Sequence, residues 1–170
     1  YAKRCIGIML LAPAVHSYTE RRVPEANVIV KNPDLFEDVP DNIRAVFENA
    51  IAVQTDYVIQ RSKEDILPAI LGADHQFLGR IRPNFRLSYE DEMNNTVFDK
   101  PGLFLLGRQD SVVGYEDATA LHEQFPRTSI VTLDRCGHGP LLDQKDLFEI
   151  LTTEWIFRVE EMLERQLQAV

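Results

Sequence analysis

The sequence predicts an α/β fold in which parallel strands form a sheet and helices flank it. Residues 103–106 and 130–133 are short apolar runs, each bounded by Gly or Pro, and a segment of helical periodicity separates them. This order is typical of parallel strands that are buried on both faces. Residues 5–11 form another run that is apolar on both faces, so we expect an interior strand there as well.

Each of the two later runs is followed by a side chain capable of acid–base chemistry. Asp110 follows the first run and His138 follows the second. Because the carboxyl ends of parallel strands meet at one edge of a sheet, we expect these side chains to project into the same region. A carboxylate beside an imidazole fixes its tautomer and stabilises the imidazolium, as in nucleophile, base and acid triads. Asp117 and Asp134 are alternative acids, but Asp117 begins a helix and Asp134 lies very close to the histidine.

Three motifs give the chain a resemblance to a known family. They are Gly107-Arg-Gln-Asp110, Val112-Val-Gly114 and Cys136-Gly-His138-Gly139, and an amphipathic helix follows them. In this order they resemble the C-terminal half of an α/β-hydrolase, whose chain order is nucleophile, acid, histidine. The resemblance covers the opening strand and residues 100–170. It implies Asp110 as the acid, His138 as the base, a small-molecule substrate and no cofactor.

The resemblance also implies a nucleophile outside these residues. A nucleophile elbow needs Gly-x-Ser-x-Gly or a close variant, because small neighbours allow its strained turn. Ser17, Ser62, Ser88, Ser111 and Ser129 all lack this context. We therefore expect the N-terminal half of the same fold, upstream of Tyr1 or on a separate chain, to supply a Ser, Asp or Cys nucleophile. We predict no hydrolytic turnover for residues 1–170 alone.

Two functions fit this reading. The first is the C-terminal part of a serine-type hydrolase that cleaves an ester, amide or related acyl bond. Within it, an aspartate nucleophile would move the chemistry to dehalogenation or epoxide opening, and a proline-releasing aminopeptidase also fits the architecture. The second is a non-catalytic ligand-binding or interaction protein on the same scaffold, because fold alone does not decide function.

The chain divides into three expected segments: a core strand in residues 1–17, a helical cap in 18–98, and a hydrolase core with the acid and histidine loops in 99–170. The cap would roof the pocket and exclude water. Within it we predict one helix from Asp41, as N-cap, to about Arg61, a further helix start at Ser62, and a short strand at 28–30. Its aromatic residues that could face the pocket are Tyr57, Phe77, Phe85 and Tyr89.

Two further side chains are singled out by their positions. His16 lies just past the opening strand and is a candidate substrate-binding residue. Asp143 is expected to cap the last helix. The apolar stripe of that helix is predicted to be buried and comprises Leu147, Ile150, Leu151, Trp155, Val159 and Leu163.

Composition excludes several classes of function. The 170 residues suffice for one domain, are 45% hydrophobic and 26% charged, and carry a formal charge of -9. No run of Lys or Arg exceeds Arg21-Arg22, which argues against nucleic acid as a partner. The apolar runs are too short to span a membrane. Cys5 and Cys136 do not make a disulfide framework and favour a cytoplasmic protein, and the four histidines share no metal-ligand spacing.

Overall fold

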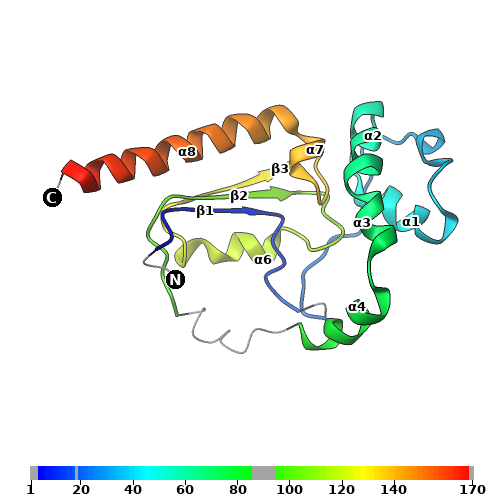
Figure 1. The fold of residues 1–170 in the computed structure, drawn as a ribbon, viewed down its shortest axis with the longest axis horizontal. Helices are drawn as coiled ribbons and strands as arrows, with labels where there is room; N and C mark the ends of the chain where they lie inside the picture. The colour runs from blue at the N-terminus through cyan, green and yellow to red at the C-terminus, as the bar shows by residue number, and fades with distance from the viewer. Residues whose placement is uncertain (1–3, 18, 86–94, 169–170) are drawn as a thin grey trace.

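The computed structural model describes residues 4–17, 19–85 and 95–168 (Figure 1). Tyr1, Ser88 and Tyr89 lie outside these ranges. The strands are β1 (Ile8–Leu11), β2 (Gly102–Gly107) and β3 (Thr128–Leu133). The α-helices are α1 (Asp41–Ala50), α2 (Asp56–Asp65), α3 (Leu67–Gly72), α4 (His75–Ile81), α6 (Glu116–Thr119), α7 (Pro140–Asp143) and α8 (Lys145–Gln168), and the 3-10 helices are η1 (Pro33–Phe36), η2 (Arg82–Asn84) and η3 (Ala120–Glu123).

The described strands form one parallel sheet in the order β1-β2-β3. In the register, Ile8 of β1 lies opposite Gly102 of β2, which in turn lies opposite Thr128 of β3. Every residue of β2 is buried, as the apolar run predicts. The predicted parallel α/β fold is therefore confirmed. One edge of β1 faces away from β2 at the border of this sheet.

Helices cover both faces of the sheet. Figure 1 shows α8 along one face and α6 on the other, with α7 at the strand tips. On the α6 side, Phe104 and Leu106 of β2 pack with Ala118. On the α8 side, the indole Nε1 of Trp155 donates a hydrogen bond of 3.1 Å to the carbonyl of Pro101. The sheet is thus sandwiched between helical layers, which is the arrangement of α/β folds.

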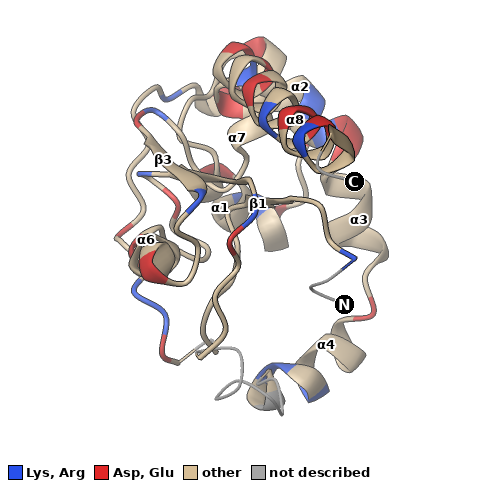
Figure 2. Ribbon diagram, turned by 90° about the vertical axis from the view of Figure 1, so that its left-hand side faces the viewer, with Lys and Arg blue, Asp and Glu red and all other residues tan. Residues whose placement is uncertain are grey.

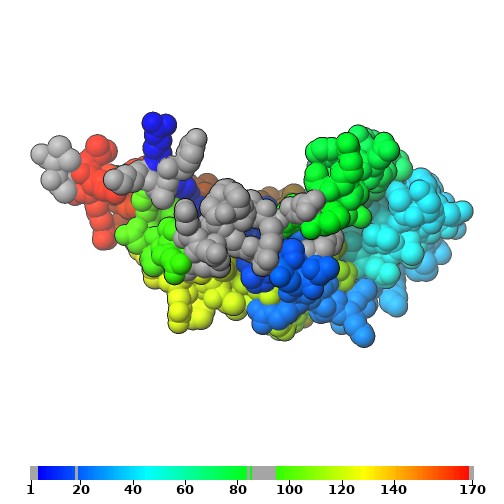
Figure 3. Space-filling view, turned by 90° about the horizontal axis from the view of Figure 1, so that it is seen from below, coloured from blue at the N-terminus to red at the C-terminus, as the bar shows by residue number. Residues whose placement is uncertain are grey.

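Figure 1 shows the helices α1 to α4 at the end of the molecule toward which the strands point, and in Figure 3 their cyan and green residues lie at one end of the molecule. A separate core lies among η1, α1, α2 and α7, and α3 packs against it; its buried residues are Phe36, Val39, Phe47, Ile51, Val58, Ile59 and Leu142. Leu142 belongs to α7, so this core extends onto the segment that follows the histidine. The helical region (residues 33–84) is therefore attached to the sheet next to the candidate site.

The single helix predicted for residues 41–61 is wrong. The chain forms α1 and α2 with an extended break between them, where Ala52 O accepts hydrogen bonds from the backbone N–H groups of Ile29 (2.9 Å) and Val30 (3.2 Å). Val30 and Val53 form an isolated parallel bridge, which replaces the short strand expected at 28–30. This distant pairing competes with helix formation, so tertiary contacts override a continuous helical period.

The helix starts in this region also differ from the prediction. Asp41 is the first residue of α1 rather than its N-cap, which is Pro40. Thr55 is the N-cap of α2, with its side chain accepting a hydrogen bond from Val58 N at 3.3 Å, and Ser62 lies inside that helix. The helix α3 then begins with a proline in its first turn, the position where proline costs least.

The C-terminal helix differs from the prediction in its start and in its buried stripe. Asp143 ends α7 and does not cap α8, which begins at Lys145. Leu147 and Ile150 are exposed, whereas Val159 is buried. Figure 2 shows acidic and basic residues interspersed along α8. In the described part of the chain, no helix has the length and apolar character needed to cross a bilayer.

Candidate active site

Asp110 lies in the turn after β2 and its carboxylate is held in one orientation. The strand ends at Gly107, whose carbonyl accepts a hydrogen bond from Asp110 N at 3.2 Å. Oδ1 of Asp110 accepts hydrogen bonds from Val112 N (2.8 Å) and Val113 N (3.0 Å). The residue is fully buried. Two backbone donors therefore hold the carboxylate, and Oδ2 is left for another partner.

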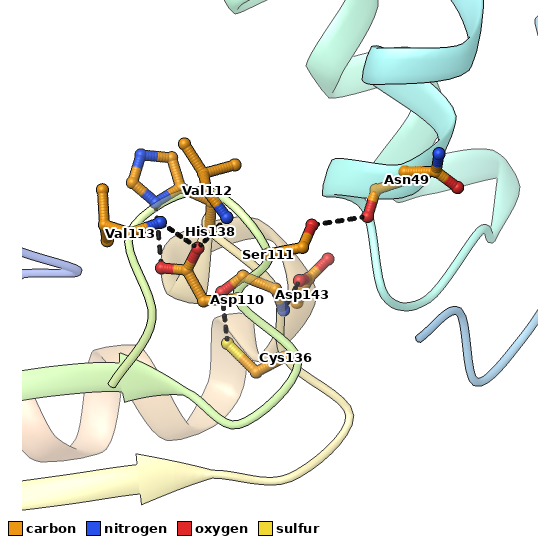
Figure 4. Close-up of polar contacts among 9 residues, drawn as sticks. Asn49, Asp110, Ser111, Val112, Val113, Cys136, His138 and Asp143 are labelled. Carbon is orange, nitrogen blue, oxygen red and sulfur yellow. Dashed lines mark hydrogen bonds and ion pairs between the residues drawn. The ribbon is translucent and has the colours of Figure 1, made fainter. Parts of the chain in front are cut away.

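That partner is His138. Nδ1 of its imidazole lies 3.0 Å from Oδ2 of Asp110, across 28 residues of sequence (Figure 4). The imidazole is 42% exposed, whereas the carboxylate is completely enclosed. A carboxylate accepts only, so it selects the tautomer with hydrogen on Nδ1 and leaves a lone pair on Nε2. Among the described residues, His138 makes no hydrogen bond through Nε2, so that nitrogen is open to a reacting group.

Backbone contacts join the acid loop (residues 107–113) to the end of β3 and to the histidine loop (residues 134–139). Arg108 N donates to Leu133 O at 2.8 Å and Gln109 N donates to Cys136 O at 2.9 Å. A side chain on Gly107 would overlap with the carbonyls of residues 136 and 137. The glycine therefore permits the direct approach of the two loops that the Asp110–His138 pair requires.

Gln109 is a buried connector that the sequence reading missed. Its Oε1 accepts from Cys136 N at 3.0 Å, and its Nε2 donates to Oδ1 of Asp134 at 2.8 Å. This hydrogen bond lowers the pKa of Asp134. Asp134, an alternative acid in the sequence, is thus a partner of Gln109. The adjacency of Gln109 to the acid is the one signal that could have marked it.

The helical region touches both loops. The hydroxyl of Ser111 donates to the carbonyl of Asn49 at 3.2 Å, as Figure 4 shows. On the other loop, a side chain at Gly137 would overlap with the carbonyl of Ala50. The end of α1 therefore rests on the acid loop and the histidine loop together.

A cavity of about 420 Å³ lies between the helical region and the histidine loop. Its walls are mainly aliphatic or aromatic. The described residues that line it are Ile43, Val46, Phe47, Ala50, Ile51, Ser62, Ile66, Ile70, Val112, His138, Gly139, Leu142 and Asp143. The cavity lies within the size range of small-molecule sites, about 300–1,000 Å³. It brings the imidazole of His138 to the wall of an apolar chamber.

Two further ionisable groups lie beside the pair. Burial raises the pKa of Asp143 to about 6, with a smaller contribution from the charge of Asp110, while the hydrogen bond from Gly137 N lowers it. Burial also raises the pKa of the Cys136 thiol well above its ordinary value, and the charges of Asp143 and Asp110 add to the effect. Cys136 is completely buried and unpaired, so it is a thiol at neutral pH and a poor nucleophile.

The remaining sequence candidates lie elsewhere. The carbonyl of His16 accepts a hydrogen bond from Nε of Arg21 at 2.8 Å, and His16 is not among the described residues that line the cavity. Burial raises the pKa of Asp117, but hydrogen bonds from Arg22, one of them 2.6 Å long, outweigh this and lower it overall. Asp117 therefore anchors Arg22 and is not a partner of His138.

Among the aromatic residues expected to face the pocket, Tyr57, Phe77 and Phe85 do not line this cavity. Tyr57, Phe77 and Phe85 are each 48% exposed. Tyr57 instead lines a neighbouring cavity that Asp143 also borders. In the described ranges, no cluster of three or more His, Cys, Asp or Glu side chains could hold a metal ion.

Solved structures similar to this chain are α/β hydrolases. An α/β superfamily hydrolase from Oenococcus oeni PSU-1 is 21% identical with a TM-score of 0.80, and the match covers 91% of this chain and 58% of that one. A thermophilic esterase is 13% identical with a TM-score of 0.58, and the match covers 92% of this chain and 58% of the esterase. An esterase from Exiguobacterium antarcticum is 17% identical with a TM-score of 0.58, and the match covers 88% of this chain and 56% of that esterase.

These similarities establish the α/β-hydrolase fold for this chain. It spans 58% of the length of the Oenococcus oeni hydrolase. No protein-family model matches the sequence, and no curated protein is significantly similar to it.

Proposed function

We propose that this chain is part of a serine-type α/β hydrolase that cleaves an ester, amide or related acyl bond in a small apolar molecule. The observation that carries the proposal is the 3.0 Å contact between His138 and the buried carboxylate of Asp110, at the wall of an apolar cavity. The hydrolases and esterases with this fold support it by analogy.

The proposed chemistry follows from the tautomer that Asp110 selects. Nε2 of His138 takes the proton of the nucleophilic hydroxyl as its oxygen attacks the acyl carbon. The imidazolium that forms carries Nδ1–H and Nε2–H, and the negative charge of Asp110 stabilises it. When the tetrahedral intermediate collapses, Nε2–H protonates the leaving alcohol or amine. Water then repeats the cycle on the acyl-enzyme, with His138 again as the base, and releases the acid.

The apolar cavity favours an uncharged acyl group as the substrate portion bound there. Apolar side chains from α1, from Ile51 and Ile66, and from α3 form much of its wall, and Asp143 beside His138 disfavours an anionic group. Burial of apolar surface supplies about 25 cal/mol for each Å² removed from water. In this role the helical region acts as a cap that selects the substrate and excludes water.

The nucleophile is proposed to come from the N-terminal half of the same fold, on the same chain or on a separate one. Within the described sheet β1 pairs with β2 on one edge, and its other edge offers backbone groups for a further strand. Exposed apolar side chains on α8, Ile150 and Phe157 at 64% each, offer surface for packing. A Gly-x-Ser-x-Gly elbow in that half agrees with acyl transfer, whereas Gly-x-Asp-x-Gly would move the reaction to alkyl halides or epoxides.

A fluorophosphonate probe tests the proposal. In the protein that contains the nucleophile, the serine hydroxyl should displace fluoride from phosphorus and become labelled. His138→Ala should slow labelling by about 10³-fold or more, because the general base is lost. His122→Ala is the matched control, since His122 is an exposed residue of η3, and it should label normally. A protein that never labels, yet binds apolar ligands, would instead indicate a non-catalytic binding protein.

A further inference from the structure

Asp143 makes hydrogen bonds to both neighbours of His138. Its Oδ2 accepts from the backbone N–H of Gly137 at 2.6 Å, and its own backbone N–H donates to the carbonyl of Gly139 at 2.9 Å. Figure 4 shows Asp143 and Asp110 near the same loop. The peptide units on the two sides of the histidine are therefore both tied to the end of α7.

These contacts bear on the direction of the His138 side chain. The Asp110 carboxylate holds the imidazole at Nδ1 but does not fix the backbone from which the ring projects. Gly137 and Gly139 flank His138, and glycine has the largest backbone freedom to lose. A short, charge-assisted bond to Gly137 N removes much of that freedom. The Asp110 carboxylate thus holds the imidazole at Nδ1, and the Asp143 carboxylate holds the backbone next to it at Gly137 N.

An ionised carboxylate at position 143 lowers the stability of the folded chain, because it is buried and lies near the charge of Asp110. Its charge interacts with Asp110 and Cys136 on the two loops, which also carry Arg108, Asp134 and Arg135, and His138 shares its cavity. Tyr57, Lys145 and Asp146 share its second cavity. A neutral residue would avoid both the burial of charge and the repulsion from Asp110. A neutral residue could also form the turn at this position. We therefore attribute the acid to the short hydrogen bond that its Oδ2 accepts from Gly137 N.

We propose that Asp143 is a positioning residue for the histidine. It holds the backbone of residues 137–139 so that the imidazole of His138 stays within hydrogen-bond distance of Asp110. The catalytic consequence rests on the proposed function, whereas the positional role rests on the contacts alone. Asp143 acts through the backbone and need not touch the reacting atoms.

NMR spectroscopy of the ¹⁵N-labelled chain tests the positional role. Asp143→Ala should increase the exchange rate of the Gly137 amide by about 10-fold or more and broaden the Nδ1–H signal of His138, since both groups lose a fixed partner. Asp143→Asn retains an acceptor oxygen and should largely preserve both signals. Asp146→Asn is the matched control, because Asp146 is an exposed acid at the start of α8. Unchanged Gly137 exchange and His138 signals in Asp143→Ala would overturn the proposal.

A second pair of variants covers the case in which Asp143→Ala does not fold. In a His138→Gln background, the chemical shift of the Gly137 amide proton should titrate with the carboxylate that accepts from it. Adding Asp143→Asn should remove that titration. A Gly137 shift that titrates equally in both proteins would show that the bond is not formed, and would also overturn the proposal.

Kinetics separates this inference from the proposed function. In a protein that hydrolyses esters, Asp143→Ala should lower kcat by about 10–100-fold with little change in KM, because small misplacements of a catalytic group cost rate more than binding. Asp143→Asn should recover most of kcat. Wild-type kcat in Asp143→Ala would exclude the positioning role. A parent without hydrolase activity would contradict only the proposed function, and the NMR comparison would still decide the role of Asp143.

Discussion

The carboxylate of Asp110 and Nδ1 of His138 lie 3.0 Å apart, although 28 residues separate them in the chain. The contact follows from parallel strands, because β2 and β3 lie side by side and both deliver their following loops to the same edge of the sheet. The loops then meet through backbone hydrogen bonds and the absence of a side chain at Gly107. The pair is therefore a product of sheet topology.

In the protein that supplies the nucleophile, replacing Asp110 with asparagine should abolish most of the proposed hydrolysis while leaving the fold intact. The amide oxygen can still accept from Val112 N and Val113 N, but the amide nitrogen then faces Nδ1 and donates to it, which favours the wrong imidazole tautomer. We expect kcat to fall by about 10⁴-fold, as judged from the corresponding change in serine proteases. Turnover of a chromogenic ester and the urea unfolding midpoint measure the two effects. Near-normal turnover would remove Asp110 from the mechanism.

Gln109 should matter for stability because it is buried and its side chain connects two loops. Gln109→Leu leaves the buried N–H of Cys136 without its 3.0 Å partner, so we expect a loss of about 1–3 kcal/mol in the free energy of unfolding. Gln60→Leu is the control, because Gln60 is exposed on α2 and its side chain donates to Glu64 on the same helix face. The control should change stability by no more than about 0.5 kcal/mol. Equal unfolding midpoints for the two variants would contradict the connecting role of Gln109.

The sheet and the Asp110–His138 pair could be predicted from the sequence because both depend on local signals. Apolar runs bounded by Gly or Pro mark buried strands, and polar residues directly after them mark the edge where sites form. The parallel order of residues 8–11, 102–107 and 128–133 follows from these patterns. Here local preference and tertiary structure agree.

The break between α1 and α2 could not be predicted in the same way. The apolar positions continue with helical spacing up to Ile51. However, the carbonyl of Ala52 accepts hydrogen bonds from the backbone N–H groups of Ile29 and Val30, which belong to a distant segment. The prediction that Asp143 caps the last helix is wrong for a related reason, since an acid before an apolar helix is typical of a cap. Its true partner, Gly137 N, lies on the preceding loop and has no sequence signal of its own.

Gly137→Ala should disturb the contact between the helical region and the histidine loop. The new methyl group would overlap with the backbone carbonyl of Ala50, which cannot rotate away, so we expect a loss of about 1–3 kcal/mol in stability. Gly79→Ala is a matched control in α4, where no atom lies within 4 Å of the added carbon. That control should gain about 0.5–1 kcal/mol from helix propensity. Urea unfolding of both variants checks the opposite signs.

Cys136 should be inert to alkylation in the folded protein. Its thiol is buried, and burial together with the charges of Asp143 and Asp110 raises its pKa. Cys5 is only partly buried and is the internal control. At pH 8 we expect iodoacetamide to modify Cys136 at least about 100-fold more slowly than Cys5, as mass spectrometry of peptides can show. Comparable rates, with loss of hydrolysis, would make Cys136 a candidate nucleophile.

The raised pKa of Asp143 predicts a pH-dependent stability that an asparagine should remove. Below about pH 4 the carboxyl is protonated in both the folded and the unfolded chain, so its contribution is fully present. Between about pH 4 and its folded pKa of about 6, the folded state binds the proton more tightly, and stability falls as pH rises. The shift corresponds to at most about 3 kcal/mol.

Asp143→Asn should therefore match the parent near pH 4 and be more stable at pH 8, by up to about 3 kcal/mol. Carboxylates with lowered pKa values, such as Asp117, have the opposite effect, because the stability that they contribute is lost as pH falls. They are present in both proteins, so their effect cancels in the difference in stability between parent and variant. Urea unfolding of the two proteins at pH 4, 6 and 8 measures this difference directly. A difference that is independent of pH would mean that the Asp143 carboxylate ionises as freely in the fold as in water.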